Sequence, residues 1–473
     1  MSAIPYTHDA LVIGAGAAGL TAAGGCALFG LSVALIEQGA MGGECLNTGC
    51  VPSKALLAAA ARAAERGMRL GIDLGEPNVD WAGVRAHVDG AIAAIEHHDS
   101  QERFEAMGVE IIRARASFLS RDTLRAGERT LRAPRIVIAT GSRPAVPPID
   151  GIESVPFLTN ENLFQLDELP LRLAVIGAGA IGMEMAQAFR RLGSDVTVIA
   201  PARALERHDE EAAALVKASL ESEEVRFITG EVKCISGSAG QLSLGSSNGE
   251  KIAASHVLVA AGRKANVGSL DLDKAGVKTG KDGIEVDSRR RTSNKRIYAI
   301  GDCRAGPRFT HVSGYEGSNV ALEIALGLPA RADFTALAHC TFTSPELAQV
   351  GLTEHEARER HGAKVRVVRQ DFADNDRAVC EGRSEGFLKL VMKGGKVLGA
   401  TAVGEHAGEL LLPWSQVISG KASTFALGSA VVAYPMRSDI SKEAAFTAWE
   451  PTVFGKWPRR LARLVARSRR IGR

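Results

Sequence analysis

Two copies of one glycine-rich strand–helix–strand pattern restrict the fold of this 473-residue chain more than any other feature. In the first copy, residues 10–16 are expected to form a buried strand, 17–30 a helix and 32–37 a second strand. The same order recurs between residues 171 and 200, and each copy carries G-x-G-x-x-G at the start of its helix. These glycines are Gly14, Gly16 and Gly19 in the first copy and Gly177, Gly179 and Gly182 in the second.

Each glycine of such a unit has its own physical role. The first permits a tight turn, the second lets the backbone approach a pyrophosphate, and the third lets the helix pack closely on the strand. The phosphates then lie at a helix N-terminus, where free N–H groups favour anions. Because the pattern occurs twice, the sequence predicts an α/β fold with two Rossmann-like dinucleotide-binding domains.

The residue that ends the second strand differs between the two copies. Glu37 ends it in the first copy, where a carboxylate can bind ribose hydroxyls. Ala200 ends it in the second, and Arg203, Arg207 and His208 follow. A 2′-phosphate is not repelled there, and arginine can pair with it in a bidentate manner. The second copy is therefore expected to bind NADPH in preference to NADH, unless these basic residues only form a solvated loop face.

Charge and cysteine usage narrow the class of protein. Residues 451–473 carry eight Lys and Arg and no acid, which leaves −5 for residues 1–450 within a formal net charge of +3. An acidic body argues against nucleic acid as the main partner. Residues 11–36 are uncharged, but their six glycines fit the nucleotide-binding unit better than a membrane span. Seven mostly scattered cysteines are no disulfide framework, so a cytoplasmic location is expected.

The pattern changes after about residue 335. Extended segments are expected at 341–350, 364–370 and 387–391, with a hairpin turn at 393–396 and helices from about His406. Thr353 and Glu356 predict a capping box at the start of a helix that ends at His361. Earlier in the chain, helices are expected at 55–67 and 81–107, strands at 135–139 and 297–300, and a linker at 144–151. The C-terminal part is thus expected to be an antiparallel α+β domain.

Cys45 and Cys50 lie in the most specific segment, Gly-Gly-Glu-Cys-Leu-Asn-Thr-Gly-Cys-Val-Pro-Ser-Lys. A disulfide needs Cα atoms within about 7 Å, whereas five residues of helix rise about 7.5 Å. The pair can bond only if non-helical backbone separates the cysteines, which Asn47 and Gly49 can supply. Pro52 suits the first turn of a helix, so Cys50 is expected at a helix N-terminus that stabilises its thiolate. No second Cys/His pair lies at ligand spacing, so no metal site is predicted.

These motifs resemble those of the class I pyridine nucleotide–disulfide oxidoreductases over about residues 8–450. The resemblance implies an FAD-binding domain at 1–152 and 263–335, an NAD(P)-binding domain at 153–262, a dimerisation domain at 336–450, and a homodimer. The basic tail at 451–473 lies beyond the resemblance and is indicated by composition alone. It also implies that electrons pass from a nicotinamide cofactor through FAD to the Cys45–Cys50 pair and then to a small-molecule acceptor such as a disulfide or a metal ion.

The resemblance carries roles to individual residues. Cys45 would exchange with the acceptor, Cys50 would contact the flavin, and Lys54 near the flavin would pair with Glu184. Asp302 would bind the ribityl chain of the flavin. Further candidate cofactor-binding residues are Gly43, Lys54, Thr140, Gly141 and Gly262. A tyrosine gates the nicotinamide pocket in glutathione reductase, and Ala180 holds that position here.

The chain departs from the disulfide-reducing members near its C-terminus. Those members carry His-Pro-x-x-x-Glu, in which the histidine protonates the leaving thiolate, whereas here Tyr434 and Asp439 hold the two positions. Tyrosine, with a pKa of about 10, is a poor proton donor near neutrality. In having a tyrosine at this position the chain resembles mercuric reductases and their relatives, so it is identified as a mercuric-reductase-like member of the family. Mercuric reductases also use a C-terminal cysteine pair, but the last cysteine here is Cys380.

Three alternatives remain open from the sequence. The flavin could reduce a quinone or similar acceptor directly, Tyr434 could be only a packing residue, and the chain could be a non-catalytic flavoprotein subunit of a larger complex. The basic tail is expected to be a flexible charged end. A basic amphipathic helix with Leu461, Leu464 and Val465 on one face, touching anionic lipid, is the less favoured alternative.

Overall fold

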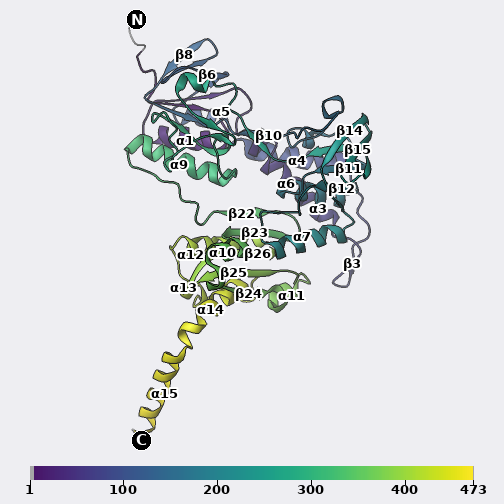
Figure 1. Cartoon of the computed structure of the whole chain (residues 1–473), viewed down its shortest axis with the longest axis vertical. Coiled ribbons are helices and arrows are strands. Elements are labelled where there is room, and N and C mark those ends of the chain that lie inside the picture. Colours follow the sequence, from purple (N-terminus) through teal and green to yellow (C-terminus); the bar gives the residue numbers. More distant parts are fainter. Residues whose placement is uncertain (1–4, 472–473) are drawn as a thin grey trace.

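The computed structural model describes residues 5–471, which form three packed lobes and one projecting helix (Figure 1). The first lobe is built on a five-stranded parallel sheet in the order β21-β9-β1-β2-β5. Its elements are β1 (Ala10–Ile13), α1 (Ala17–Leu28), β2 (Val33–Glu37), α5 (Gln101–Ala106), β5 (Val109–Arg113), β9 (Arg135–Ile138), β21 (Ile297–Ala299) and α9 (Thr310–Leu326). The chain thus leaves this sheet after β9 and returns about 160 residues later to add β21.

Both faces of this sheet are covered, which explains why its strands are apolar without alternation. Helices α1 and α9 pack on one face, around Val12, Leu35 and Val137. The antiparallel sheet β6 (Ala116–Ser120), β7 (Thr123–Ala126) and β8 (Arg129–Arg132) covers the other face through Phe118 and Leu124. Smaller elements of this lobe are β10 (Ser142–Pro144), β18 (Arg263–Ala265), α8 (Leu272–Ala275), β19 (Thr279–Gly280), β20 (Gly283–Ile284) and the 3₁₀ turn η3 (Gly301–Cys303). The hairpin of β3 (Met68–Arg69) and β4 (Ile72–Asp73) lies apart from this lobe, on the side of the second and third lobes (Figure 1).

The second lobe repeats the plan with a four-stranded parallel sheet, β13-β12-β11-β17. Helix α3 packs against α6, and α4 packs on α3. A three-stranded antiparallel sheet, β14-β15-β16, packs against the other face of the parallel sheet. The elements are α3 (Cys50–Ala63), α4 (Trp81–Glu96), η1 (Ile152–Ser154), η2 (Leu163–Gln165), β11 (Arg172–Ile176), α6 (Ala180–Leu192), β12 (Asp195–Ala200), α7 (Glu210–Ser222), β13 (Arg226–Thr229), β14 (Val232–Ser238), β15 (Gln241–Ser246), β16 (Lys251–Ala254) and β17 (His256–Val259).

The third lobe holds a five-stranded antiparallel sheet, β22-β23-β26-β25-β24, with helices on it. Its strands are β22 (Ala338–Thr341), β23 (Glu346–Gly351), β24 (Val365–Asp371), β25 (Phe387–Lys393) and β26 (Lys396–Gly404). Its helices and turns are α10 (Glu354–His361), η4 (Gly362–Lys364), η5 (Phe372–Asp374), α11 (Asp376–Cys380), η6 (Ala407–Leu410), α12 (Leu411–Ile418), α13 (Thr424–Gly428) and α14 (Asp439–Val453). The expected capping box of Thr353 and Glu356 and the hairpin at 393–396 are both present.

Three expected elements were wrong in their bounds. The strand at 341–350 is two strands, β22 and β23, because Pro345 lies between them and has no N–H for a sheet hydrogen bond. The helix at 81–107 is interrupted, because the Ser100 hydroxyl caps a new helix by accepting from the N–H of Arg103. The helix at 55–67 instead runs from Cys50 to Ala63.

The basic tail is not the flexible end that was favoured. It forms helix α15 (Lys456–Ile471), which projects from the third lobe beyond α14 (Figure 1). Ala, Leu and Arg are strong helix formers, which explains the continuous helix. None of the helices described for residues 5–471 has the length and apolarity needed to cross a membrane.

Candidate active site

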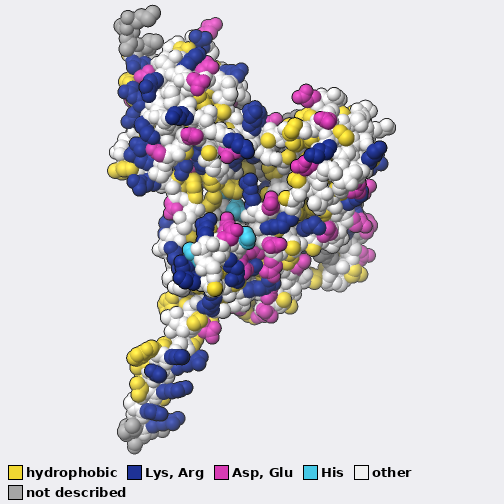
Figure 2. Space-filling model, viewed as in Figure 1, with side chains coloured by type: hydrophobic (Ala, Val, Ile, Leu, Met, Phe, Trp, Pro, Cys, Tyr) yellow, Lys and Arg dark blue, Asp and Glu magenta, His cyan; other side chains and the backbone are white. Residues whose placement is uncertain are grey.

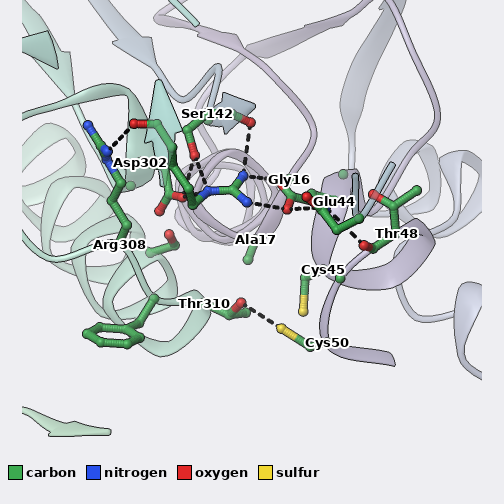
Figure 3. Close-up of a pocket in the computed structure, with 18 of the residues that line it drawn as sticks. Gly16, Ala17, Glu44, Cys45, Thr48, Cys50, Ser142, Asp302, Arg308 and Thr310 are labelled. Carbon is green, nitrogen blue, oxygen red and sulfur yellow. Dashed lines mark hydrogen bonds and ion pairs between the residues drawn. The ribbon is translucent and has the colours of Figure 1, made fainter. Parts of the chain in front are cut away.

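A cavity of about 1320 Å³ lies where the three lobes meet. Residues far apart in the sequence line it, and Figure 3 shows those around the cysteines. Most of the predicted site residues line this cavity: Gly14, Gly16, Glu37, Gly43, Cys45, Cys50, Lys54, Thr140, Gly141, Gly179, Glu184, Gly262 and Asp302. Ala180, at the start of α6, also lines it, which leaves this wall without the tyrosine gate of glutathione reductase. The predicted residues outside its lining are Gly19, Gly177, Gly182, Arg203, Tyr434 and Asp439.

The first nucleotide-binding turn has the geometry that its glycines predict. Gly14 has φ +103°, which disfavours other residues, and a Cβ on Gly19 would lie 1.8 Å from the Gly14 carbonyl oxygen. Gly16 faces the cavity, with Gly43 Cα 3.9 Å from the position of a Cβ. The carboxylate of Glu37 accepts hydrogen bonds from the N–H groups of Ala15 and Gly39, both at 2.6 Å. A helix N-terminus, open space at Gly16 and a fixed carboxylate fit the pyrophosphate and ribose of FAD.

The second turn repeats this geometry. Gly177 has φ +113°, and a Cβ on Gly182 would lie 2.0 Å from the Gly177 carbonyl oxygen. Gly179 lines the cavity, with no atom within 4 Å of the position of a Cβ. The space that a nicotinamide dinucleotide needs is therefore present at the N-terminus of α6.

The basic residues after β12 have different surroundings. The Arg203 guanidinium donates to the carbonyl oxygens of Glu206 and His208 at 2.9 and 3.0 Å, so it holds the loop together. His208 packs edge-on against His339, and burial, with a smaller contribution from His339, lowers the pKa of His208 to about 4. His208 is therefore neutral near pH 7 and does not add positive charge for a 2′-phosphate. Arg207 is exposed.

A break in the helical backbone separates the two cysteines. Helix α2 (Gly43–Asn47) contains Cys45, and Cys50 is the first residue of α3. Gly49 forms the break at φ −128° and ψ −111°, where a Cβ would lie 2.9 Å from the Glu44 carbonyl oxygen. Asn47 ends α2 instead of leaving the helical conformation, and its side-chain amide donates to two carbonyl oxygens of the same loop. Both cysteines are free thiols in this structure.

The two thiols differ in acidity. Hydrogen bonding with Cys45, assisted by Thr310 and by the charge of Lys54, lowers the pKa of Cys50 to about 6 against the effect of burial. The Thr310 hydroxyl, at the start of α9, lies 3.2 Å from Cys50 Sγ (Figure 3). Hydrogen bonding to Cys50, burial and repulsion by a Cys50 thiolate raise the pKa of Cys45. In the dithiol, Cys50 therefore holds the negative charge and Cys45 keeps its proton.

Lys54 on α3 and Glu184 on α6 form an ion pair between two helices of the second lobe. Lys54 Nζ lies 2.7 Å from Glu184 Oε2, and the Glu184 side chain is only 6% exposed. The other oxygen of Glu184 accepts from the N–H of Phe342 at 3.0 Å, and Lys54 lies over the Phe342 ring. The pair thus links α3, α6 and the third lobe at one wall of the cavity.

The sequence did not indicate a second network, which holds the cysteine loop against the first lobe. Arg263 donates to both carboxylate oxygens of Glu44, the residue before Cys45, and its Nε donates to Ser142 Oγ at 2.7 Å. The Ser142 hydroxyl donates to Asp302 at 2.7 Å. The sequence could have pointed to Arg263 and Ser142 by their position, because each directly follows a predicted site glycine. Thr310 had no such signal.

Tyr434 and Asp439 lie away from the cavity of their own chain. Tyr434 is 75% exposed, and its hydroxyl donates to Asp376 at 2.5 Å. This hydrogen bond raises the pKa of Tyr434 above its usual value. The Asp439 carboxylate accepts from the N–H of Met436 at 3.0 Å and so closes the loop before α14.

Replacing Thr310 by Val is expected to raise the pKa of Cys50 by about one to two units, because a charged hydrogen bond contributes about 1.5–3 kcal/mol. Thiolate absorbance of the reduced wild type should appear as the pH rises through about 6 and disappear below it. In the Val variant the midpoint should move toward that of an ordinary thiol. Thr310→Ser keeps the hydroxyl and should restore the wild-type midpoint, and identical titrations of all three proteins would remove Thr310 from this role.

Two family profiles together match most of the chain. The sequence profile described as "Pyridine nucleotide-disulphide oxidoreductase" matches residues 8–317, and that of the dimerisation domain of the same family matches residues 337–445. A mercuric reductase of Lysinibacillus sphaericus is 34% identical over 93% of this chain and 82% of its own length. Dihydrolipoyl dehydrogenase 3 of Haloarcula marismortui is 35% identical over 95% and 98%.

A solved structure shares the fold of nearly the whole chain. The HOCl-induced flavoprotein disulfide reductase RclA from Escherichia coli matches with a TM-score of 0.83 and 28% identity, over 92% of this chain and 98% of that one. RclA has also been solved as a Cu(II) complex.

Proposed function

The chain belongs to the pyridine nucleotide–disulfide oxidoreductases, and from this membership we propose that its Cys45–Cys50 dithiol passes electrons to a thiophilic metal ion. Members of the family are FAD-dependent and use NAD(P)H, and this chain is an FAD-dependent NAD(P)H oxidoreductase with a redox-active disulfide. What the family does not fix is the acceptor.

Tyr434 is the observation that carries the proposal. Reduction of a disulfide releases a thiolate, which must be protonated, and a tyrosine whose pKa is raised by Asp376 is a poor donor near neutrality. A metal ion has no leaving thiolate to protonate. The names of relatives agree, because several are mercuric reductases and one solved neighbour is a Cu(II) complex.

The chain's own residues divide the work of the reaction. Bound NAD(P)H and FAD supply the electron pair, with Glu37 and the glycine turns holding the dinucleotides and Asp302 holding the flavin. The protonated Cys45 meets the acceptor, and the Cys50 thiolate closes the disulfide. When the dithiol becomes a disulfide it gives up two electrons, which reduce one ion by two electrons or two ions by one each. The proton of Cys45 leaves to solvent.

We also propose a homodimer formed through the lobe that matches the dimerisation domain. The domain division is proposed at 1–152 with 263–335, 153–262, 336–450 and 451–473. A cytoplasmic location remains a prediction, and it suits a dithiol that has to be kept reducible.

An anaerobic acceptor panel tests the proposed function. The flavin-loaded protein with NAD(P)H is expected to reduce Hg(II) or Cu(II) at least about tenfold faster than glutathione disulfide or lipoamide, since general acid catalysis contributes about 10²–10⁴-fold to a step that needs it. A Tyr434→His variant should gain disulfide reduction and keep metal reduction. Disulfide reduction by the wild type that outpaces every metal would overturn the proposal.

A stack of rings on the cavity wall favours a second candidate, direct reduction of a quinone by the flavin. The Phe309 ring lies parallel to those of His311 and His339, with centroids 5.2 and 5.7 Å away, and all three line the cavity. A planar acceptor can stack on such a surface. Quinone turnover that disappears in Cys45→Ser would count against this candidate.

NADPH is the proposed donor, because no acid stands at the end of β12 and Arg203 lies in the loop beyond it. In an anaerobic titration NADPH should reduce the protein at a lower concentration than NADH. Arg203→Ala should raise the KM for NADPH about tenfold and leave that for NADH nearly unchanged, because a bidentate contact to the 2′-phosphate is lost. Equal effects of Arg203→Ala on both nucleotides would mean that Arg203 only supports the loop.

A further inference from the structure

Helix α15 has two chemically different faces. Its apolar side chains lie at positions spaced by three or four residues, which places them on one edge of a helix. Those described are Trp457, Leu461, Leu464 and Val465, with exposed fractions of 80, 62, 61 and 41%. The basic side chains lie mainly on the opposite side: Lys456, Arg459, Arg460, Arg463, Arg467, Arg469 and Arg470. Figure 2 shows the two rows along the projecting helix.

Nothing among the described residues covers the apolar edge. The helix extends away from the third lobe (Figures 1 and 2), and its apolar side chains remain in contact with solvent. Ser468 Oγ donates a hydrogen bond to the Val465 carbonyl oxygen at 2.9 Å, which is a contact within the helix itself. A row of large exposed apolar side chains next to a charged row is typical of a surface that binds something else.

The charge of α15 indicates what kind of partner surface the helix binds. The helix has seven basic residues and no acidic one, so arginines at i and i+4, such as Arg459, Arg463 and Arg467, repel one another in water. Residues 1–450 carry −5, so the attraction to an anionic surface is confined to the tail. An anionic surface neutralises the basic row and removes the repulsion that opposes the helix.

The dimensions of α15 exclude a membrane span. Sixteen residues of helix extend about 24 Å, less than the roughly 30 Å hydrocarbon core, and seven of them are charged. A helix with a large apolar edge and a Lys/Arg row instead lies in the plane of the membrane interface. Trp457 suits that depth, because an indole ring has an apolar body and one N–H donor.

We propose that α15 is a surface anchor that docks this oxidoreductase on a bilayer containing anionic lipid. Trp457, Leu461, Leu464 and Val465 enter the interface, while the arginines bind lipid phosphates. A second copy of α15 fits less well, because two helices with seven positive charges each repel. Nucleic acid would use the basic row but would leave the apolar edge exposed.

Flotation of the flavin-loaded full chain with vesicles tests the anchor. Vesicles of phosphatidylcholine with phosphatidylglycerol are expected to carry the protein, whereas pure phosphatidylcholine vesicles should bind at least about tenfold less, because each basic residue near an anionic surface adds to binding. High salt should release the protein. Binding that is equal on both vesicles, or absent from both, would overturn the proposal.

Variants assign the binding to the apolar edge. Leu461→Ser with Leu464→Ser should reduce binding to anionic vesicles about tenfold or more. Leu28→Ser with Leu171→Ser removes two leucines that are 76 and 80% exposed elsewhere, and should bind as the wild type does. Flavin content and NAD(P)H oxidation should be unchanged in both pairs, which separates lost anchoring from misfolding. Undiminished binding by the α15 pair would refute the role of this edge.

Trp457 gives a local readout. Its emission is expected to shift to shorter wavelength with anionic vesicles, while Trp457→Phe should lose the shift and still bind. Light scattering of a chain ending at residue 455 should show the wild-type oligomeric state. If removal of α15 dissociated the oligomer, the apolar edge would belong to a contact between copies, and the lipid anchor would be wrong.

Discussion

Serine at position 45 is expected to abolish reduction of a thiophilic metal ion by NAD(P)H, with kcat falling by at least about 10³-fold, on the scale seen when a covalent nucleophile is removed. Cys45 is the thiol that keeps its proton, and in the proposed reaction it meets the acceptor, while Thr310 and Lys54 stabilise the Cys50 thiolate. A serine hydroxyl cannot form a disulfide with Cys50, so the electron pair has no carrier. Anaerobic NAD(P)H oxidation with Hg(II) or Cu(II) measures the effect.

Other cysteines of the chain provide the controls. Cys234 and Cys380 are exposed free thiols on β14 and α11, outside the cavity, and their serine variants should retain activity within about twofold. Cys50→Ser should also lose turnover, together with the long-wavelength absorbance that a Cys50 thiolate gives beside flavin in the two-electron-reduced protein. Full activity of Cys45→Ser with every acceptor would remove the dithiol from the mechanism.

Local patterns predicted most of the fold. The two glycine turns and their flanking strands and helices begin and end within a few residues of the predicted bounds. Tight turns and buried parallel strands can be predicted in this way because each depends on the types of consecutive residues. The strand at 341–350 was wrong because it was inferred from apolar content across Pro345. The prediction of a flexible tail was wrong because it was inferred from the high charge of the terminus. The Leu, Ala and Arg content of the tail instead favours a helix.

The candidate site shows where local reasoning ends. Cys45, Cys50 and Glu37 were found from neighbouring residues, and the break at Gly49 followed from the spacing of the cysteines. Lys54 and Glu184 lie 130 residues apart, and only the family resemblance paired them before the structure placed them 2.7 Å apart. Thr310 and Arg263 reach the cysteine loop through tertiary packing, and the only sequence signal for either was the position of Arg263 next to Gly262. The family matches confirm the predicted fold class, whereas the roles of individual site residues stay predictions.

Replacing Glu316 by Ala is expected to destabilise the first lobe by about 3–5 kcal/mol, the cost of breaking a buried ion pair by removing one partner. Glu316 lies on α9 and is fully buried, and it forms ion pairs with Arg304 and Arg290, which are 1 and 10% exposed at their side chains. It also accepts from the N–H of Gly301 at 2.9 Å, next to Asp302. Alanine would leave two buried guanidinium groups without their carboxylate. Chemical unfolding followed by circular dichroism measures the loss.

The same substitution should also weaken FAD binding. This effect distinguishes the ion pairs of Glu316 from ion pairs that only stabilise the fold. Glu316 holds the backbone of Gly301, and the neighbouring Asp302 is the predicted flavin ligand in the Arg263–Ser142 network, so the variant should release FAD at lower denaturant than it unfolds. Glu359→Ala removes a carboxylate from the exposed pair with His355 and should cost less than about 1 kcal/mol without weakening FAD binding. If the two variants behaved alike, the buried cluster would not be what fixes the Asp302 loop. If Glu316→Ala lost stability but kept FAD to the same denaturant concentration as the fold, the cluster would stabilise the lobe without positioning the cofactor.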